Sequence, residues 1–309
     1  MALEIQSLSV CVPGGCPNKC KFCVSRMHPS NYEDQIEKNL RFYDLYSDDF
    51  CRRLQFARDN GCNTVILTGD GEPLMNIKFL KDFAHWNNSI QSPFRWIEIQ
   101  TSGVSLDDEK LRFLRNTVGV SSISLSLSDM CDNESNQEMN DTPDKLKVDI
   151  AKLCSEIKRY DFNLRLSLNM TNRYEKRWGA GKFDPKKTID RYEVCFEGMM
   201  GRAKYLGANM VTFRQLYVSG DPDLEQNKWI AENRADETLL IVIKQTIREE
   251  GRMLEALPFG AVRYSYEGMS LVVDDDCMST DVKPVMKYLV LRPNCKLYTK
   301  WDDEGSILF

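Results

Sequence analysis

The 309-residue sequence predicts an α/β fold: a partial (β/α)6 barrel of the TIM type, with a C-terminal β-hairpin extension. Three observations lead to this prediction. Short β-rich runs alternate with helical patterns, which implies parallel strands joined by crossover helices. Six such units are present, fewer than the eight of a closed TIM barrel. After about Gly251 the pattern changes to hairpins.

The expected strands are Glu4–Val12, Asn63–Thr68, Trp96–Thr101, Ser121–Ser128, Phe162–Met170 and Met210–Val218. The expected helices between and after them are Asp48–Asn60, Ile77–Trp86, Asp107–Asn116, Pro143–Tyr160, Pro185–Leu206 and Ala235–Glu250. Asp107 precedes an acidic first turn, and Thr142-Pro143 is typical of an N-cap followed by proline at the first helical position. In barrels the chemistry lies at the C-terminal ends of the strands, so these ends are the candidate site.

The last part of the chain predicts two hairpins. Val262–Asp274 is expected to turn at Glu267-Gly268, and Tyr288–Trp301 at Pro293-Asn294. We therefore interpret residues 1–250 as the barrel and residues 251–309 as a β extension packed on it, closing its open side.

Composition narrows the functional classes. A net charge of −5 argues against a broad nucleic-acid-binding face, and no apolar run approaches the roughly 18 residues that a membrane span requires. The N-terminal residues lack the pattern of a signal peptide. Eleven cysteines are an odd number, which favours reduced thiols or metal ligands over a disulfide framework. The cytoplasm is the expected compartment.

The most informative motif follows the first strand directly. Cys16, Cys20 and Cys23 fall within eight residues, after Pro13-Gly14-Gly15. Iron–sulfur clusters are held by cysteine runs of this compactness, and three ligands for four irons would leave one iron open for catalysis. The alternatives are a Cys₃His zinc site completed by His28, or three unrelated core cysteines.

The spacing C-x₃-C-x₂-C, with Phe22 before the third cysteine, resembles the radical S-adenosylmethionine (radical SAM) superfamily. The resemblance implies a 4Fe-4S cluster held by the three cysteines, whose fourth iron binds SAM through its amine and carboxylate. It also implies an electron donor such as flavodoxin or ferredoxin. The implied reaction is reductive cleavage of SAM to a 5′-deoxyadenosyl radical, which abstracts hydrogen from an unactivated C–H of the substrate in a lyase or another radical-mediated reaction.

Two further strand ends carry the resemblance. Thr68–Leu74 is similar to the family's G-E-P loop, which contacts the SAM ammonium; by that match Gly71 and Glu72 bind the cofactor. The third strand ends in Thr101-Ser102-Gly103, similar to a T-N-G strand end, although Ser102 replaces the asparagine. Thr101 is therefore a further candidate cofactor contact.

The fourth and fifth strands carry polar residues at alternating positions, which point to one face. Such side chains are costly to bury without partners, and SAM would supply partners. We expect Ser126, Ser167 and Asn169 to contact SAM, although small polar side chains could simply fill the barrel. Arg214 and Gln215 on the sixth strand are weaker candidates that could equally form a structural ion pair.

The substrate is expected to be a small molecule. Cys277 and Cys295 are isolated, so no auxiliary cluster is expected, and no large basic domain for RNA is present. The loop at residues 172–181 would cover the active site or form a solvated turn. Asp274, Asp275 and Asp276 would either be an exposed acidic strand end or bind donor groups of the substrate.

The compact build is similar to enzymes of 7-deazapurine bases, queuine lyase among them. Three alternatives remain open at this stage. The chain could be an activating enzyme that generates a glycyl radical on a partner protein, a radical SAM enzyme that modifies tRNA or rRNA, or a non-catalytic zinc protein.

Overall fold

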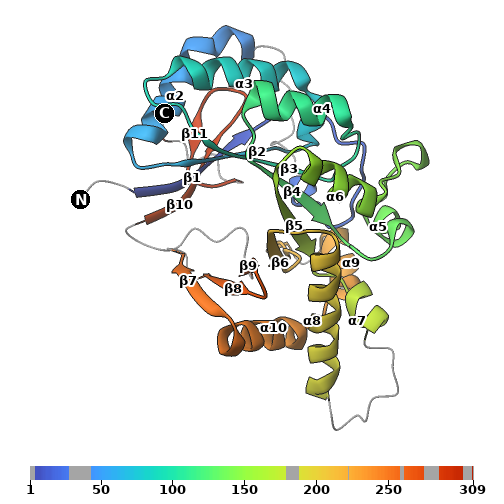
Figure 1. Cartoon of the computed structure of the whole chain (residues 1–309). Helices are drawn as coiled ribbons and strands as arrows, with labels where there is room; N and C mark the ends of the chain where they lie inside the picture. The colour runs from blue at the N-terminus through green and yellow to red at the C-terminus, as the bar shows by residue number, and fades with distance from the viewer. Residues whose placement is uncertain are drawn as a thin grey trace.

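The structure, a computed structural model, describes residues 4–27, 43–178, 188–221, 223–257, 261–274, 285–301 and 308. All six predicted strands are present, and each pairs in parallel with the next. They are β1 (Glu4–Cys11), β2 (Thr64–Thr68), β3 (Trp96–Thr101), β4 (Ser122–Leu127), β5 (Asn163–Asn169) and β6 (Met210–Arg214). Their sheet curves around an interior and is the centre of the molecule (Figure 1).

Five C-terminal strands extend this sheet at both ends. They are β7 (Arg252–Ala256), β8 (Val262–Tyr266), β9 (Met269–Asp274), β10 (Val285–Leu291) and β11 (Leu297–Tyr298). The order is β11-β10-β1-β2-β3-β4-β5-β6-β9-β8-β7, which makes one open, eleven-stranded sheet. β9 runs parallel to β6 and β10 runs parallel to β1, whereas the outer strands β7, β8 and β11 are antiparallel.

The hairpin turn at Glu267-Gly268 is present, with positive φ at both residues. The structure differs from the expected arrangement in where the hairpins lie: each supplies one strand to the barrel sheet and so continues it. β7 forms a further strand that the sequence pattern did not indicate. A domain boundary at residue 250 stays a prediction.

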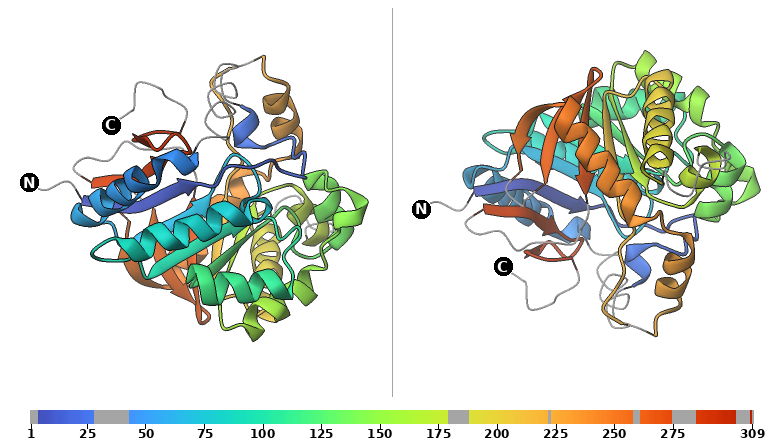
Figure 2. Two further views of the ribbon diagram at one scale, coloured as in Figure 1. Left: turned by 90° about the horizontal axis from the view of Figure 1, so that it is seen from above. Right: turned by 90° about the horizontal axis from the view of Figure 1, so that it is seen from below.

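Helices lie outside the sheet. They are α2 (Ser47–Asp59), α3 (Ile77–Ser89), α4 (Asp108–Phe113), α5 (Asn133–Asn140), α6 (Ile150–Arg159), α7 (Arg173–Trp178), α8 (Thr188–Tyr205), α9 (Glu225–Asn233) and α10 (Glu237–Glu250). Figure 2 shows most of them around the outer side of the curved sheet, whereas α9 lies beside the cysteine loop, where Trp229 stacks on Phe22. None of the described helices is long and apolar enough to cross a membrane.

Helix starts were predicted with mixed success. Asp107 caps α4, because its side chain accepts a hydrogen bond from Lys110 N at 2.8 Å. The expected start at Thr142-Pro143 is wrong. Pro143 precedes a separate 3₁₀ turn, and α6 begins at Ile150, where the Asp149 carboxylate accepts from Lys152 N at 3.0 Å. A carboxylate that bonds the free first-turn amides fixes a helix start more strongly than proline does.

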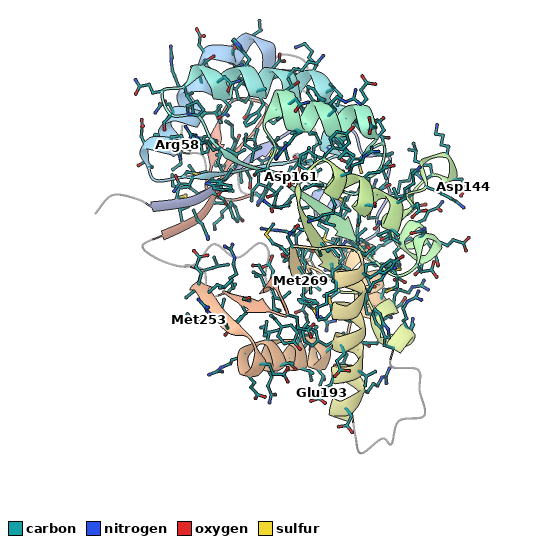
Figure 3. All side chains as sticks on the ribbon, in the orientation of Figure 1. Arg58, Asp144, Asp161, Glu193, Met253 and Met269 are labelled. Atoms are coloured by element: carbon teal, nitrogen blue, oxygen red, sulfur yellow. The ribbon has the colours of Figure 1, made fainter. Side chains whose placement is uncertain are left out.

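The core lies between the sheet and its helices, and side chains fill this space (Figure 3). Apolar residues at alternate strand positions face outward and are fully buried; examples are Leu8, Val65, Ile99 and Leu164. The residues between them face the interior of the curve and are polar in most strands, as on β4. The apolar face holds the fold together, and the polar face lines a lumen.

Candidate active site

The cysteine loop follows β1. Cys16 is exposed, Cys20 and Cys23 are partly buried, and all three are free thiols. Burial, followed by the nearness of the other two thiols, raises the pKa of Cys20 to about 12. Although Cys16 is exposed overall, partial desolvation of its thiol raises its pKa, and the nearby Glu72 carboxylate and Cys23 thiol add to the rise. The three sulfur atoms therefore lie within electrostatic reach of one another at the C-terminal end of β1.

A second loop, residues 68–74 between β2 and α3, supports the cysteine loop backbone to backbone. Val12 N donates to Thr68 O at 2.7 Å, and Glu72 N donates to Gly15 O at 3.2 Å. At Gly71 an added Cβ would lie 2.2 Å from Gly14 O. Gly71 therefore permits a contact that no side chain would allow, immediately before the first cysteine.

Glu72 lies beneath these loops and is 3% exposed. Its carboxylate accepts hydrogen bonds from Thr101 Oγ1 at 2.6 Å, Ser102 Oγ at 2.7 Å and Ser102 N at 2.9 Å, together with a longer one from Leu74 N. Four donors occupy the acceptor sites that a carboxylate offers. In this structure Glu72 and Thr101 join the loop to the end of β3.

The C-terminal end of α5 holds the other side of the cysteine loop. Asn140 O accepts from Lys19 N at 3.2 Å and from Cys20 Sγ at 3.4 Å. The Asn140 side chain accepts from Ser128 Oγ, which in turn accepts from Asn169 Nδ2 at 3.2 Å. Sequence reasoning missed α5 and Asn140; the N-cap Asp132, which accepts from the amides of residues 134 and 135, was the available signal.

A cavity of about 190 Å³ lies under the cysteine loop. Among its lining residues are Cys20, Cys23, Ser126 and Asn169, which the sequence had placed in one site, and Asn18 and Asn140, which it had not. Ser167 lies next to Ser126 in the sheet register and is 2% exposed. Gly71 and Glu72, in the supporting loop, and Thr101, at the end of β3, are not among the lining residues.

The residues present fit an iron–sulfur cluster and SAM. The Asn18 Oδ1 and Ser167 Oγ atoms are buried and have no hydrogen-bond partner among the described residues, so the region retains unused capacity for a polar ligand. Within the described ranges, no three His, Cys, Asp or Glu side chains form a group that could hold a single metal ion. A cluster does not need such convergence, because each thiolate binds a different iron. His28 of the zinc alternative lies outside the described residues.

The lumen contains a larger cavity of about 420 Å³, lined by many polar side chains together with apolar ones such as Ile66 and Val272. Two ion pairs face it: Arg165 Nη2 lies 3.2 Å from Glu98 Oε2, and Arg214 Nε lies 3.9 Å from Asp274 Oδ2. Asp274 is thus on the lumen wall at the end of β9, opposite Arg214 in the register with β6. Asp275 and Asp276 lie outside the described residues. Gln215 lines the cavity under the cysteine loop.

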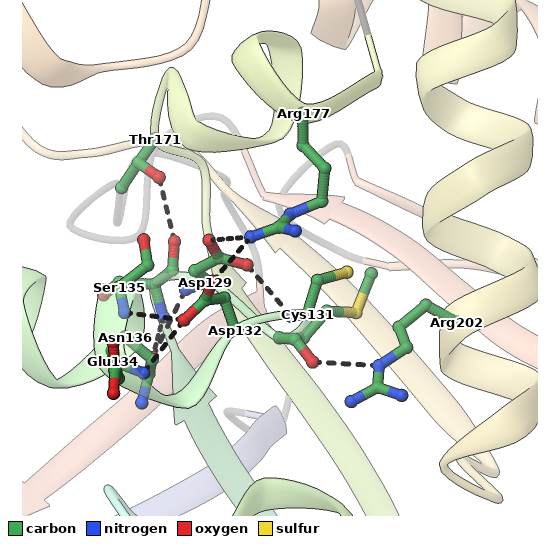
Figure 4. A network of polar contacts seen from close by, with 11 residues as sticks. Asp129, Cys131, Asp132, Glu134, Ser135, Asn136, Thr171, Arg177 and Arg202 are labelled. Carbon is green, nitrogen blue, oxygen red and sulfur yellow. Dashed lines mark hydrogen bonds and ion pairs between the residues drawn. The ribbon is translucent and has the colours of Figure 1, made fainter.

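The segment expected to be a covering loop contains helix α7. Tyr174 is fully buried, and Arg177 pairs with Asp129 at 3.2 Å and with Asp132 at 3.4 Å. Figure 4 shows this network, in which Arg202 of α8 also donates to the backbone of the β4–α5 loop. Residues 173–178 therefore anchor the loop after β4, a structural role; residues 179–181 lie outside the described part of the chain.

Comparison with known proteins agrees with this geometry. The family model of the radical SAM superfamily matches residues 10–171, more than half of the chain. No protein of curated function matches the sequence. The comparisons do not show the likeness to queuine lyase.

Solved structures of proteins with bound S-adenosylmethionine share the fold. Streptococcus suis SuiB bound to S-adenosylmethionine has a TM-score of 0.55 at 14% identity, over 96% of this chain and 60% of SuiB. The protein anSMEcpe with bound AdoMet and the Kp18Cys peptide has a TM-score of 0.52 at 12% identity, over 99% of this chain and 77% of that one. The chain thus spans about 60% of the length of SuiB.

The open parallel sheet is the partial TIM barrel of these structures. With the three-cysteine loop at the end of β1 and the family match across residues 10–171, it shows that the chain belongs to the radical SAM superfamily, whose members use a 4Fe-4S cluster and SAM.

Proposed function

We propose that this radical SAM enzyme abstracts hydrogen from a small polar molecule held in the lumen. The observation that carries the proposal is the adjacency of two cavities. One lies under the cysteine loop and the other lies in the lumen, and Val24 and Arg214 line both. A substrate in the lumen would therefore lie beside a cofactor bound under the loop.

Each part of the site has a role in this proposal. Cys16, Cys20 and Cys23 would hold the cluster, and Ser126, Ser167 and Asn169 would bond the polar groups of SAM. Gly71, Glu72 and Thr101 would position the cysteine loop relative to the end of β3, next to where the SAM ammonium would bind. When bound, the cluster and SAM supply a 5′-deoxyadenosyl radical. Exposed Cys16 would leave one edge accessible to a donor such as flavodoxin or ferredoxin.

For the substrate we propose a 7-deazapurine base, the substrate class of queuine lyase. The lumen offers hydrogen-bond acceptors and donors at two positions along the strands, one at the Glu98–Arg165 pair and one at the Arg214–Asp274 pair. Tyr288 and Trp301 line another part of the wall, where a flat ring could stack. Asp274 would accept hydrogen bonds from donor groups of the base, as carboxylates do. The reaction would be a lyase or another radical-mediated transformation.

The test uses anaerobically purified protein. We expect it to be brown, to hold about four irons per chain, and to lose them in Cys20→Ala. With SAM and a chemical reductant it should form 5′-deoxyadenosine, and a panel of 7-deazapurine bases should accelerate this reaction. A colourless protein that contains zinc would overturn the assignment of the cysteine loop.

A peptide or protein substrate is the second candidate. It is favoured by the fold shared with anSMEcpe, whose structure holds the Kp18Cys peptide. The glycyl-radical activating function belongs to the same class. If peptides or a partner protein accelerate 5′-deoxyadenosine formation and no base does, the second candidate replaces the first.

A further inference from the structure

Glu98 and Arg165 meet inside the lumen from strands that are not neighbours. Glu98 is on β3 and Arg165 on β5, with β4 between them. β4 presents Ser122 and Ser124 at this level, in register with Glu98 and Arg165 respectively. Because serine side chains are short, the longer chains from both sides meet above β4, with Glu98 only 7% exposed and Arg165 27% exposed.

The bonding capacity of this pair is only partly used. Arg165 Nε is buried and has no hydrogen-bond partner among the described residues, and the same holds for Ser124 Oγ. Within the described part of the chain, Arg165 Nη2 otherwise contacts only the weak acceptor Met210 Sδ at 3.6 Å. Glu98 Oε1 accepts a long bond of 3.5 Å from Gln100. Buried charges are costly unless further hydrogen bonds satisfy them, so a ligand would complete this arrangement.

The position of the pair suits the inner end of a ligand. Glu98 and Arg165 line the lumen cavity and also a second cavity of about 350 Å³ toward the N-terminal ends of the strands. Arg165 pairs in register with Met210, four residues before Arg214 on β6. At about 3.3 Å per residue, the pair lies roughly 13 Å along the sheet from Arg214, which borders the cofactor cavity.

We propose that Glu98 and Arg165 recognise an amide-type edge, an N–H group beside a C=O group, such as the lactam edge of a 7-deazaguanine base. Glu98 accepts from the N–H, and Arg165 donates to the carbonyl oxygen. Because the pair is neutral as a whole, it matches a neutral ligand with both a donor and an acceptor. The inference rests on the proposed function and assigns the residues that select its substrate.

Calorimetry on the anaerobic holoenzyme with SAM tests this inference, with 7-deazaguanine and 7-deazaadenine as probes. The second base lacks the lactam edge. The wild type should bind 7-deazaguanine at least about tenfold more tightly than 7-deazaadenine, and Glu98→Gln should remove that preference. Iron content and SAM affinity should stay at wild-type values. Glu138→Gln is the matched control, because Glu138 pairs with Arg173 at the exposed surface.

Glu98→Gln alone leaves the partly buried Arg165 without its partner, so the double variant E98Q/R165M is measured beside it. Equal affinity of the wild type for the two bases would overturn the inference, as would unchanged selectivity in both variants. The ratio of wild-type affinities for the two bases still tests the inference if neither variant folds. A wild-type holoenzyme that cleaves SAM but shows no lactam preference would refute only this recognition pair. A wild-type protein that binds no iron and does not cleave SAM would refute the proposed function.

Discussion

Glu72 shows what a motif can and cannot predict about a single residue. Similarity to the G-E-P loop predicts Glu72 as a cofactor residue, and in the structure its loop contacts the cysteine loop, with Glu72 N donating to Gly15 O. A direct contact between Glu72 and SAM stays a prediction; in the structure the carboxylate is buried and bonded to the end of β3. A motif identifies residues that occur together; it does not show which way a side chain points. That direction depends on donors supplied by a distant strand.

The buried carboxyl of Glu72 predicts a pH-dependent stability. Burial raises its pKa above the ordinary value of 4.5, and the hydrogen bonds from Thr101, Ser102 and Leu74 only partly oppose this. The folded state therefore holds the proton more tightly than the unfolded chain does. This contribution to the free energy of unfolding is full below pH 4.5 and is lost as the pH rises through the folded pKa.

Glu72→Gln removes the titrating group. The free energy of unfolding of the wild type, relative to that of E72Q, should therefore decrease from acid toward neutral pH, measured by denaturant unfolding of the iron-free proteins. The control is Glu109→Gln, which changes an exposed carboxyl on α4. A difference between wild type and E72Q that does not vary with pH would contradict the explanation from burial.

At the scale of elements, the two loops that meet before Cys16 depend on a close backbone approach. Gly71→Ala would place a Cβ 2.2 Å from Gly14 O and 2.9 Å from Gly15 O, and backbone atoms cannot move aside as a flexible side chain would. We expect the variant to displace the cysteine loop and to hold far less iron than the wild type. Iron analysis after anaerobic reconstitution measures this effect.

Gly15→Ala is the matched control for that variant, since nothing lies within 4 Å of a Cβ added at Gly15. Gly15 is adjacent to Cys16 and on the same loop, yet its replacement should leave the iron content at the wild-type value. Iron loss in both variants would mean that the loop needs glycine flexibility in general. Full iron content in Gly71→Ala would show that the contact between the loops is dispensable.

Helices and strands could be predicted where the pattern that marks them lies within their own residues. The six strands are short β-rich runs bounded by turns, most with apolar residues at alternate positions, and α4 begins at its acidic cap. Helix α5 was not predicted because its sequence, Asn133–Asn140, has few apolar residues. Its buried residues are Asn136, Met139 and Asn140. Its burial comes from polar contacts with Ser128 and the cysteine loop, which no periodicity reveals.

At the scale of the whole molecule, strand pairing between segments far apart in the chain determines where the C-terminal strands lie in the sheet, which the sequence pattern did not predict. The turn at Glu267-Gly268 is local and was predicted. The parallel pairing of β10 with β1 and of β9 with β6 joins segments far apart in the chain, and the residues of β9 and β10 alone do not indicate it. This pairing places Asp274 beside Arg214 in the lumen.

The same pairing predicts that residues 1–250 do not fold alone. Without the C-terminal strands, β1 and β6 would become open edges, and the core would lose Leu271, Val273, Leu289 and Leu291, all buried. Burying one such side chain contributes about 1.5–3 kcal/mol, so four contribute roughly 6–12 kcal/mol. A typical domain has a total stability of only about 5–15 kcal/mol.

We therefore expect the 1–250 fragment to aggregate, or to unfold without a cooperative transition in denaturant, under conditions in which the full chain unfolds cooperatively. Unpaired parallel edges would favour association, since their free N–H and C=O groups pair readily with other strands. Size-exclusion chromatography and circular dichroism distinguish the outcomes. A monomeric fragment with a cooperative transition would instead support a domain boundary at residue 250, and the lumen wall formed by β9 and β10 would then be an addition to a complete barrel domain.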